Sequence, residues 1–280
     1  MAVSLFSPPL ARLLRGAFAV GLGVIAAVFA ARAADLDQIR AAKLLRVGLP
    51  AADTPAFLVR QPGGALGGLE GELLQDLARR MDVRLELIRE ARTGDELVAQ
   101  VAAGRVDVAV GQLPDALEWA KHVRFTVPYV ALFEVRLIDR LAAVRAGGVA
   151  ALLQRPEARL AAAAGSPAVP LLRESLGADR LLVTPTLDDA LEAVAAARAV
   201  GVVGDDVSLS RWLDGNAAAG IRWEVQARRD RPVTLAMAVS WQAERLHTWL
   251  NLYLEKGTHD ETLRNLAVKH LGKARTEVAK

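Results

Sequence analysis

Two stretches of this 280-residue chain indicate its fold: ELVAQVAAGRVDVAVG, from Glu96 to Gly111, and DALEAVAAARAVGVVG, from Asp189 to Gly204. Each starts with a helical pattern, turns through a small residue and ends in an apolar run that stops at glycine. Aligned without gaps, they match at Val101/Val194, Ala102/Ala195, Ala103/Ala196, Arg105/Arg198, Val110/Val203 and Gly111/Gly204. An internal repeat and a chance likeness of alanine-rich segments both explain the match. Either way, the chain holds two similar α/β units.

The first unit continues toward the N-terminus with alternating apolar runs and helical patterns. The runs at Leu44–Leu49, Arg84–Ile88 and Val106–Val110 are rich in β-branched residues and predict buried strands. The apolar stripe of Gly71–Met81 predicts a helix, and a second helix is expected over Asp95–Ala103. Strands that alternate with helices predict a mainly parallel sheet with right-handed crossovers.

The second unit follows the same plan. We expect strands at Arg159–Ala164, Arg180–Thr184 and Val200–Val203, and helices at Pro167–Leu176 and Leu187–Ala197. Ligands of such α/β units bind beyond the carboxyl ends of the strands, so two units predict a cleft between two lobes.

The C-terminal part adds one strand and two helices to this plan. Val233–Val239 is expected to be a strand, and Trp241–Lys256 a long amphipathic helix. Gly257 is expected to end that helix, and Thr258 to cap a last one.

Residues 1–33 have the pattern of a secretory signal peptide. Arg12 and Arg15 precede an apolar run from Ala17 to Ala31, which is short for a membrane span. Small residues then favour cleavage after Ala33, with an uncleaved anchor as the alternative. No cysteine follows the run, so a lipid-anchored form is not expected. The mature chain is therefore predicted to be a soluble periplasmic protein.

Composition excludes several kinds of chemistry. The chain has no cysteine, which rules out thiol catalysis, disulfides and thiolate metal sites. Arg12, Arg15 and Arg32 account for the net charge of +3, so the mature chain is neutral and has no electrostatic case for nucleic acid. The four histidines lack metal spacing, and no phosphate loop, dinucleotide fingerprint or nucleophile elbow occurs. We therefore expect no catalytic residue, no metal and no cofactor.

Seven motifs, in a fixed order, resemble those of one protein family. They are KLLRVGLP (43–50), TPAF (54–57), GLEGELLQDLARRM (68–81), LVAQVAAGRVDVAVG (97–111), VRFTVPY (123–129), VVGD (202–205) and GTHDETLRNLAVKHLG (257–272). The chain resembles the periplasmic solute-binding proteins of polar amino-acid ABC transporters, family 3, which have the type II periplasmic-binding-protein fold.

The resemblance implies an α/β fold of two lobes, each a mainly parallel sheet flanked by helices, joined by a two-segment hinge. Lobe 1 would comprise residues 34–131 and 235–280, and lobe 2 residues 132–234. The chain would cross between them near Val130–Glu134 and Arg231–Leu235. It implies a monomer that captures a small polar solute, closes around it, and docks on the permease subunits of an ABC importer in the membrane.

The resemblance also points to ligand-binding residues, with one departure. The family usually places an arginine for the ligand carboxylate shortly before the Pro-Tyr pair, but here that segment, Pro114–Ala120, has none. Trp119 or Glu118 falls at its position, and Arg60 or Arg124 is a candidate replacement. Loss of such a clamp costs several kcal/mol unless another group replaces it. The resemblance therefore does not identify the ligand.

Six further positions are candidates. Asp205 matches the family acid that meets a ligand ammonium, with a helix N-cap as the alternative. Ser166, before Pro167, is expected to open a helix whose free N–H groups hold an anion, with ordinary capping as the alternative. The remaining candidates are aromatic walls and strand-end groups: Phe57, Tyr129, Gly111 and Gln112. Glu70 and Glu72 match an acidic family position and are interpreted as charges at a helix N-terminus.

Three functions are compatible with these residues. The first is a solute-binding protein that feeds an ABC importer. The second is a binding-protein-like accessory to an exported redox enzyme or a sensor, which the missing arginine favours. The third is an exported enzyme of the cyclohexadienyl dehydratase kind, which needs a placed acid and a clamp of several arginines. The sequence shows neither, so a binding protein without enzymatic activity is the main prediction.

Overall fold

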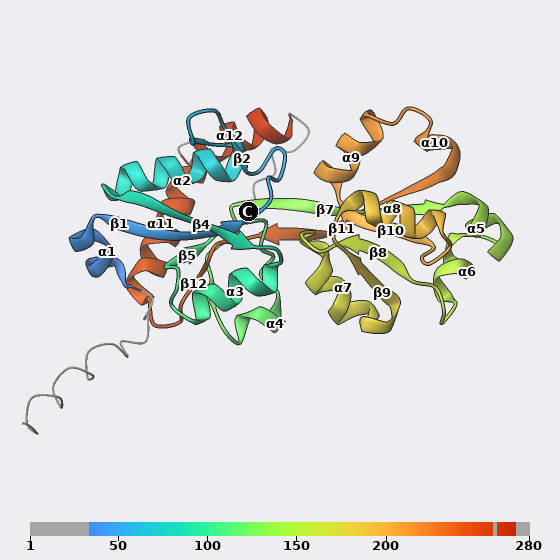
Figure 1. Ribbon diagram of the computed structural model, residues 1–280, viewed down its shortest axis with the longest axis horizontal. Coiled ribbons are helices and arrows are strands. Elements are labelled where there is room, and N and C mark those ends of the chain that lie inside the picture. The colour runs from blue at the N-terminus through green and yellow to red at the C-terminus, as the bar shows by residue number, and fades with distance from the viewer. Residues whose placement is uncertain (1–33, 260–261, 273–280) are drawn as a thin grey trace, which may run out of the picture. The chain divides into compact units, whose positions relative to one another are not determined.

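The computed structural model describes residues 34–259 and 262–272, so the predicted signal peptide lies outside the described residues. A first sheet has five strands in the order β4-β1-β5-β12-β6 (Figure 1). Their bounds are β1 Leu44–Pro50, β4 Arg84–Ala91, β5 Val108–Ala109, β6 Arg124–Phe125 and β12 Ala238–Val239. β1 is parallel to β4 and β5, whereas β12 is antiparallel to β5 and β6.

A second sheet has five strands in the order β11-β7-β10-β8-β9. Their bounds are β7 Val130–Asp139, β8 Leu160–Ala163, β9 Leu181–Thr184, β10 Gly201–Asp205 and β11 Trp223–Leu235. β8 is parallel to β9 and β10, and β7 is antiparallel to β10 and β11. The predicted fold class, an α/β protein with two sheets flanked by helices, is confirmed. Each sheet is mixed rather than mainly parallel, because two of its four strand pairings are antiparallel.

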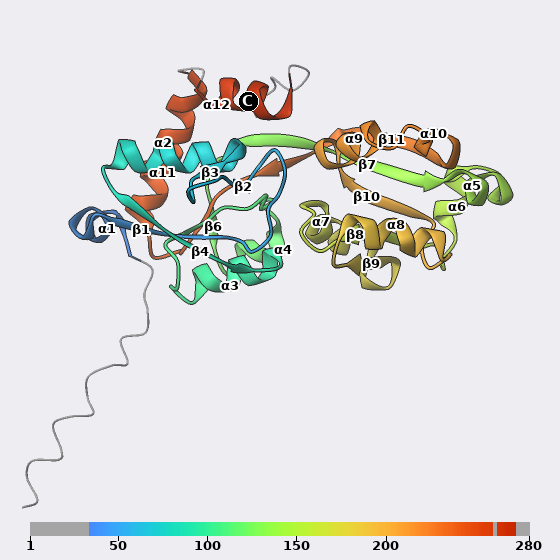
Figure 2. The same ribbon diagram turned by 45° about the horizontal axis from the view of Figure 1, so that its top comes forward.

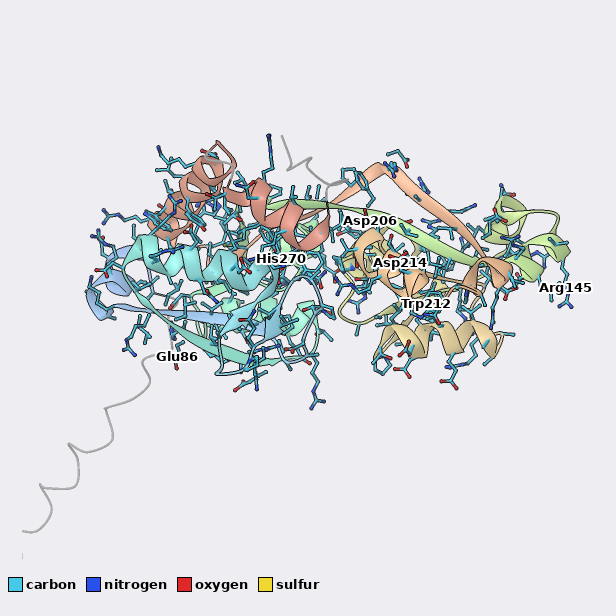
Figure 3. The ribbon with its side chains drawn as sticks, turned by 90° about the horizontal axis from the view of Figure 1, so that it is seen from above. Glu86, Arg145, Asp206, Trp212, Asp214 and His270 are labelled. Carbon is cyan, nitrogen blue, oxygen red and sulfur yellow. The ribbon has the colours of Figure 1, made fainter. Side chains whose placement is uncertain are left out.

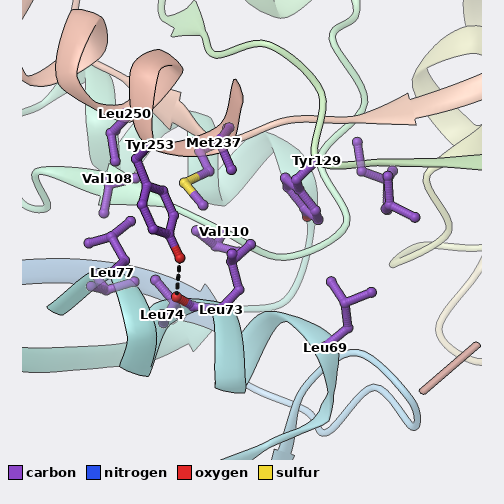
Figure 4. Close-up of a cluster of buried hydrophobic side chains, with 14 of the residues drawn as sticks. Leu69, Leu73, Leu74, Leu77, Val108, Val110, Tyr129, Met237, Leu250 and Tyr253 are labelled. Carbon is purple, nitrogen blue, oxygen red and sulfur yellow. Dashed lines mark hydrogen bonds between the residues drawn. The ribbon is translucent and has the colours of Figure 1, made fainter. Parts of the chain in front are cut away.

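Helices cover both faces of the first sheet (Figure 2). These helices are α1 Leu36–Ala42, α2 Gly68–Met81, α3 Gly94–Ala102, α4 Leu117–Ala120, α11 Glu244–His259 and α12 Thr262–Leu271. The apolar stripe of α2 packs with α11 in one core, where the hydroxyl of Tyr253 donates to the carbonyl oxygen of Leu73 at 3.2 Å (Figure 4). The other face is covered by α3 and α4, whose buried residues form a second core with Val106 and Ala109.

The second sheet is covered in the same way. Its helices are α5 Arg140–Ala146, α6 Val149–Gln154, α7 Ala168–Leu176, α8 Leu187–Ala195, α9 Asp206–Asp214 and α10 Ala219–Arg222, with a 3₁₀ turn, η1, at Ala178–Arg180. Residues of α8, α9 and α10 form one core, and residues of α5, α6 and α7 form another. Asp206 and Trp212 of α9 are marked in Figure 3, and Asp206 accepts the N–H of Phe133 on β7 at 3.0 Å.

A short antiparallel hairpin, β2 Val59–Arg60 and β3 Leu66–Gly67, precedes α2. The turn into α2 requires glycine at position 68. Gly68 has a φ of +84°, and a Cβ there would lie 2.4 Å from the carbonyl oxygen of Phe57. This hairpin could not be predicted from the sequence, because its strands are too short to show a periodic pattern.

The long strands β7 and β11 connect the two sheets. Val130 pairs with Leu235 at one end of their antiparallel ladder, and Asp139 pairs with Trp223 at the other. At the first end, Val130, Leu132, Val233 and Leu235 belong to the α2–α11 core, whereas Val135, Leu137 and Trp223 belong to a core of the second sheet. The register shifts between Arg228 and Pro232. The two crossing segments expected from sequence lie within this pair.

The C-terminal prediction is wrong in two details. The apolar run Val233–Val239 is divided between the end of β11 and the separate strand β12. Gly257 does not end the long helix and Thr258 is not a cap, because α11 continues through both to His259. Gly257 is buried, and a Cβ there would lie 3.4 Å from the side chain of Leu263. This is an ordinary van der Waals distance, so neither helix termination nor close packing requires glycine at this position.

Among residues 34–259 and 262–272, no helix is long and apolar enough to cross a membrane. The same residues contain no cluster of histidine and acidic side chains with the arrangement of a metal site.

Candidate functional site

A pocket of about 380 Å³ lies where strands of both sheets end. From the first sheet it is lined by the segments after β1 and β5, at Pro50–Ala52 and Gly111–Pro114. From the second sheet it is lined by the segment after β8, at Ala164–Pro167, and by Pro185 after β9. Ligands of open α/β sheets bind at this position, and the volume lies within the range of small-molecule sites.

The wall of the pocket is mainly apolar. Its apolar members include Pro50, Ala51, Ala52, Ala91, Leu97, Leu113, Pro114, Trp119, Ala164, Pro167, Val169, Pro170, Val183 and Pro185. The ionisable groups of this lining are Arg92, Asp95 and Arg173, and its uncharged polar side chains are Thr54, Thr93, Gln112 and Ser166. Such walls exclude water and so strengthen the few polar contacts that a ligand makes.

Trp119 forms part of this wall, at the position where the family arginine was expected. It lies on the short helix α4 and is buried, and its indole Nε1 donates to Asp95 Oδ1 at 2.7 Å. The ring fits only because residue 94 is glycine, since a Cβ on Gly94 would lie 2.3 Å from Cη2 of the indole. Glu118, the other candidate for this position, is exposed and does not line the pocket.

Asp95 connects Trp119 to the second sheet's helices. Its Oδ2 accepts a hydrogen bond from Arg173 Nη1 of α7 at 3.0 Å. Partial burial raises the pKa of the Asp95 carboxyl, but the hydrogen bonds from Trp119 and Arg173 outweigh it, so the pKa lies below its usual value. Asp95 is therefore ionised at neutral pH, and each of its oxygens has a partner.

Gly111 and Gln112 bring the end of β5 to the pocket. Gly111 has a φ of +158°, and a Cβ there would lie 2.6 Å from the ring of Pro50. Gln112 has a φ of +53°, in the left-handed region that non-glycine residues rarely adopt. Its N–H donates to Glu70 Oε1 at 2.7 Å, so a buried carboxyl group holds the turn.

Glu70 is fully buried although it lies in the first turn of α2. Its Oε1 also accepts the hydroxyl of Tyr129 at 2.5 Å. Burial raises the pKa of Glu70 to about 7, against the opposing effect of the hydrogen bonds from Tyr129 and Gln112. The pKa of Tyr129 is raised well above its usual value by burial and by the neighbouring carboxyl group.

The sequence interpretation of Glu70 as an N-terminal helix charge missed its burial. A signal was present, because Glu70 stands three, four and seven residues before Leu73, Leu74 and Leu77, on the apolar stripe of α2. Glu72, in contrast, is on the outer side and accepts hydrogen bonds from Lys269 at 2.7 Å and His270 at 3.0 Å.

The segment before α7 lines the pocket, and the N–H groups of Ser166, Ala168 and Val169 have local partners. Ser166 N donates to the Ala163 carbonyl oxygen at 2.9 Å. Ser166 Oγ accepts from Ala168 N at 3.3 Å, and the Ser166 carbonyl oxygen accepts from Val169 N at 3.1 Å. These N–H groups of the first turn of α7 therefore have local partners, and the anion contact of Ser166 stays a prediction.

The structure brings together Gly111, Gln112, Trp119 and Ser166 in the pocket lining, but not Phe57, Tyr129 or Asp205. Phe57 and Tyr129 are each 1% exposed and belong to the α2–α11 core. Asp205 is buried at the end of β10, where its Oδ1 accepts Val207 N at 3.0 Å and Ser208 N at 2.8 Å and so caps α9. The ligand contacts of all seven residues stay predictions.

Neither candidate replacement for the missing arginine lines the pocket. Arg60 is exposed on β2, and the guanidinium of Arg124 lies over the ring of Trp241 at 5.8 Å. A different arginine, which is not in the pocket lining, holds the backbone at the end of β1. Arg89 of β4 donates from Nε to the Pro50 carbonyl oxygen and from Nη2 to that of Ala52, both at 2.9 Å.

Sequence reasoning did not select Thr54, Asp95 or Arg173 as pocket residues. Thr54 is notable because its Oγ1 is buried without a hydrogen-bond partner among the described residues, as is Nε2 of Gln112. Asp95 and Arg173 lie within helical patterns, where charged residues are usually interpreted as solvated. Only the approach of α3 and α7 in space places them at the pocket.

Comparisons with known proteins agree with this architecture. A variant of ArgBP from T. maritima is 21% identical, with 85% of this chain and 99% of that chain covered and a TM-score of 0.66. The solute receptor for L-cysteine of Neisseria gonorrhoeae is 20% identical, with 85% and 94% covered and a TM-score of 0.67. An ancestral amino-acid-binding protein, described as a precursor of cyclohexadienyl dehydratase, is 23% identical, with 84% and 98% covered and a TM-score of 0.67. These likenesses show the type II periplasmic-binding-protein fold.

No curated protein matches the chain. A family model does, and it spans most of the chain, from residue 45 to residue 273. This protein therefore belongs to the bacterial extracellular solute-binding proteins, family 3.

Proposed function

We propose that this protein captures a small polar solute outside the cytoplasmic membrane and delivers it to an ABC importer, without transforming it. In this proposal residues 34–131 and 235–280 form lobe 1, residues 132–234 form lobe 2, and the solute binds between them. The observation that carries the proposal is the pocket itself, which is lined by strand-end segments of both sheets. Family membership and the names of the structural relatives, which include arginine and L-cysteine binders, support it.

Capture requires the lobes to open and close, and the paired strands β7 and β11 are the proposed hinge. One end of the pair packs in the α2–α11 core and the other end in a core of the second sheet. Between these ends, the register shifts and Pro232 has no N–H to donate to the ladder. A hinge motion concentrated there would change the pocket while leaving both cores packed.

Delivery requires export and a membrane partner. The predicted signal peptide, residues 1–33, would direct the chain across the cytoplasmic membrane and be removed after Ala33. The mature protein would then act as a monomer in the periplasm, and permease subunits would recognise its closed form.

Two other functions are alternatives to solute capture for an importer. An accessory role beside an exported redox enzyme or a sensor is favoured by the absence of an arginine at the expected position in the segment Pro114–Ala120. Dehydratase activity is suggested by the ancestral relative alone. It would need an acid free to transfer a proton, whereas Asp95, the acid of the lining, is held by Trp119 and Arg173.

Thermal unfolding of the mature chain with and without solutes tests the proposal. Amino acids, amides, dicarboxylates, amines and short peptides form the panel. A solute at 100 times its dissociation constant stabilises the folded protein by about 2.7 kcal/mol. We expect at least one solute to raise the melting temperature and to be recovered unchanged. No shift with any member would contradict capture and favour the accessory role, and turnover would favour the enzyme.

A further inference from the structure

One charged side chain of the pocket lining has no partner. Arg92 follows β4, is exposed and lines the pocket. Its backbone N–H donates to Glu96 Oε2 at 2.7 Å, but its guanidinium makes no hydrogen bond or ion pair with any residue that the structure describes. A guanidinium carries a permanent positive charge and a planar set of N–H donors that fits a carboxylate. Arg92 is therefore available to an anionic ligand in the pocket.

The other two charges of the lining neutralise each other. Asp95 Oδ2 accepts a hydrogen bond from Arg173 Nη1 at 3.0 Å, and its Oδ1 accepts one from Trp119 Nε1 at 2.7 Å. Asp95 is the only acid among the described residues that line the pocket. The lining thus has a net positive charge, and that charge is the one on Arg92.

The apolar wall strengthens the effect of this charge on a ligand. Water and salt screen an exposed guanidinium, so a bare anion in solvent is held weakly. A cleft with walls of low polarity and charge of one sign concentrates the electrostatic potential inside it. A ligand with an apolar body would cover the prolines and alanines of the wall and remove water from around Arg92. The pocket therefore favours a ligand that combines an anionic group with an apolar body.

An ammonium group finds no comparable partner in the pocket. Asp95 already accepts Trp119 at one oxygen and Arg173 at the other, so an ammonium group would have to compete with both donors. Asp205 caps α9 and Glu70 is fully buried, and neither lines the pocket. A charge that is buried without a partner is costly, and the net charge of the lining opposes a cation.

We propose that the pocket binds a small monocarboxylate that has an apolar body and no ammonium group, and that Arg92 binds its carboxylate. This inference rests on the proposed function, because it concerns the ligand of the same pocket. Arg92 follows β4, whereas the arginine expected from the family would lie in segment 114–120, where Trp119 is found instead. The pocket volume of about 380 Å³ suits a ligand of this size.

Matched probes that differ in their polar group test the inference. One series has an isobutyl body: isovalerate, isovaleramide, isoamylamine and L-leucine. A second has a benzyl body: phenylacetate, phenylacetamide, phenethylamine and L-phenylalanine. Binding to the mature full chain is measured by calorimetry at neutral pH. In at least one series, we expect the carboxylate to bind about 10-fold more tightly than the other three members, because hydrogen bonds between charged groups are the stronger ones.

Salt dependence gives a second readout that packing alone would not produce. Arg92 is exposed, so its attraction for a carboxylate is screened by ions. Raising sodium chloride from about 0.05 M to about 0.5 M should weaken binding of the carboxylate several-fold. The affinity for the amide of the same series should change little, because the amide carries no charge.

Variants of Arg92 then test the assigned cation. Arg92→Gln removes the charge and should weaken carboxylate binding roughly 10-fold, while amide binding stays within about 2-fold of wild type. Arg92→Lys keeps the charge but loses the planar fork, and its affinity should lie between the two. Arg155→Gln is the control, because Arg155 is exposed at the end of α6 and does not line the pocket. Far-UV circular dichroism and urea unfolding check that each variant is folded.

The outcomes separate this inference from the proposed function. Tighter binding of an amide, an amine or an amino acid than of its matched carboxylate in both series would overturn the inference and leave solute capture standing. Carboxylate binding that is unchanged in Arg92→Gln, or unaffected by salt, would overturn the assignment of Arg92. Silence of both series would overturn the inference, and capture is overturned with it only if the broader solute panel is silent too.

Discussion

Replacing Glu70 by glutamine should remove a pH dependence from the stability of the protein. Glu70 is fully buried, and its pKa is raised from 4.5 to about 7 by burial. Between these values the folded protein retains a proton that the unfolded chain has released. The free energy of unfolding that this group contributes is therefore highest below pH 4.5 and falls as the pH rises through 7.

The magnitude follows from the shift. Each pKa unit corresponds to about 1.4 kcal/mol, so the part of the shift that is expressed between pH 5 and pH 8 amounts to roughly 2–3 kcal/mol. Glu70→Gln keeps an oxygen that can accept from Gln112 N and Tyr129 Oη, and it cannot ionise. The variant should gain stability relative to the wild-type protein by this amount over that pH interval.

Urea unfolding of both proteins at several pH values between 5 and 8 measures the difference. Groups such as His247, whose pKa is lowered by burial, contribute equally to both proteins and cancel. Tyr129 does not titrate in this interval, because its pKa is raised well above 10. A constant difference between wild type and variant across the interval would refute the buried, proton-retaining carboxyl group.

Two further substitutions test packing and capping. Gly94→Ala should lower the free energy of unfolding by about 1–3 kcal/mol and change the tryptophan fluorescence, because the added Cβ would lie 2.3 Å from the Trp119 ring. Gly220→Ala is the control and should leave the stability nearly unchanged, because a Cβ there would have no atom within 4 Å. Equal urea midpoints for the two variants would contradict the close packing of Trp119 against residue 94. Asp205→Ala should cost about 1 kcal/mol through loss of the α9 cap, and Asp205→Ser should restore most of it. Solute binding that persists in the serine variant would count against a ligand role for Asp205.

The fold was predictable because most of its strands and helices are long enough to carry a periodic pattern. The apolar stripe of α2 and the buried run of β1 were predicted nearly to their ends. The pairing partners of the strands were harder to predict from the sequence. β12 contains only Ala238 and Val239, so nothing in the sequence separates it from the end of β11. Gly257 was misassigned as a helix end because glycine often terminates helices, whereas here α11 continues to His259.

The candidate site was predictable only in part. The strand ends Gly111 and Gln112 follow from the position of β5. Trp119 follows from its place before the Pro-Tyr pair, and Ser166 from the turn that opens a helix. The partners of these residues depend on contacts across the fold. Asp95 and Arg173 are 78 residues apart in sequence, and Glu70 and Gln112 are 42 apart. No local pattern contains such pairs, so the engaged charges and the unpartnered amide appeared only in the structure.

The register shift in the β7–β11 ladder has a mechanical consequence. Residues 229–231 are extra on one strand and lie opposite the peptide between Phe133 and Glu134, where the register shifts. On each side of this gap the ladder resumes, and residues of the paired strands belong to a core. In the proposed hinge, bending is therefore expected to concentrate over these few residues, so that a torque on either sheet would bend this gap without loosening side-chain packing. Adding or removing residues in this gap would therefore alter the stiffness of the proposed hinge without altering the packing of the cores at its two ends.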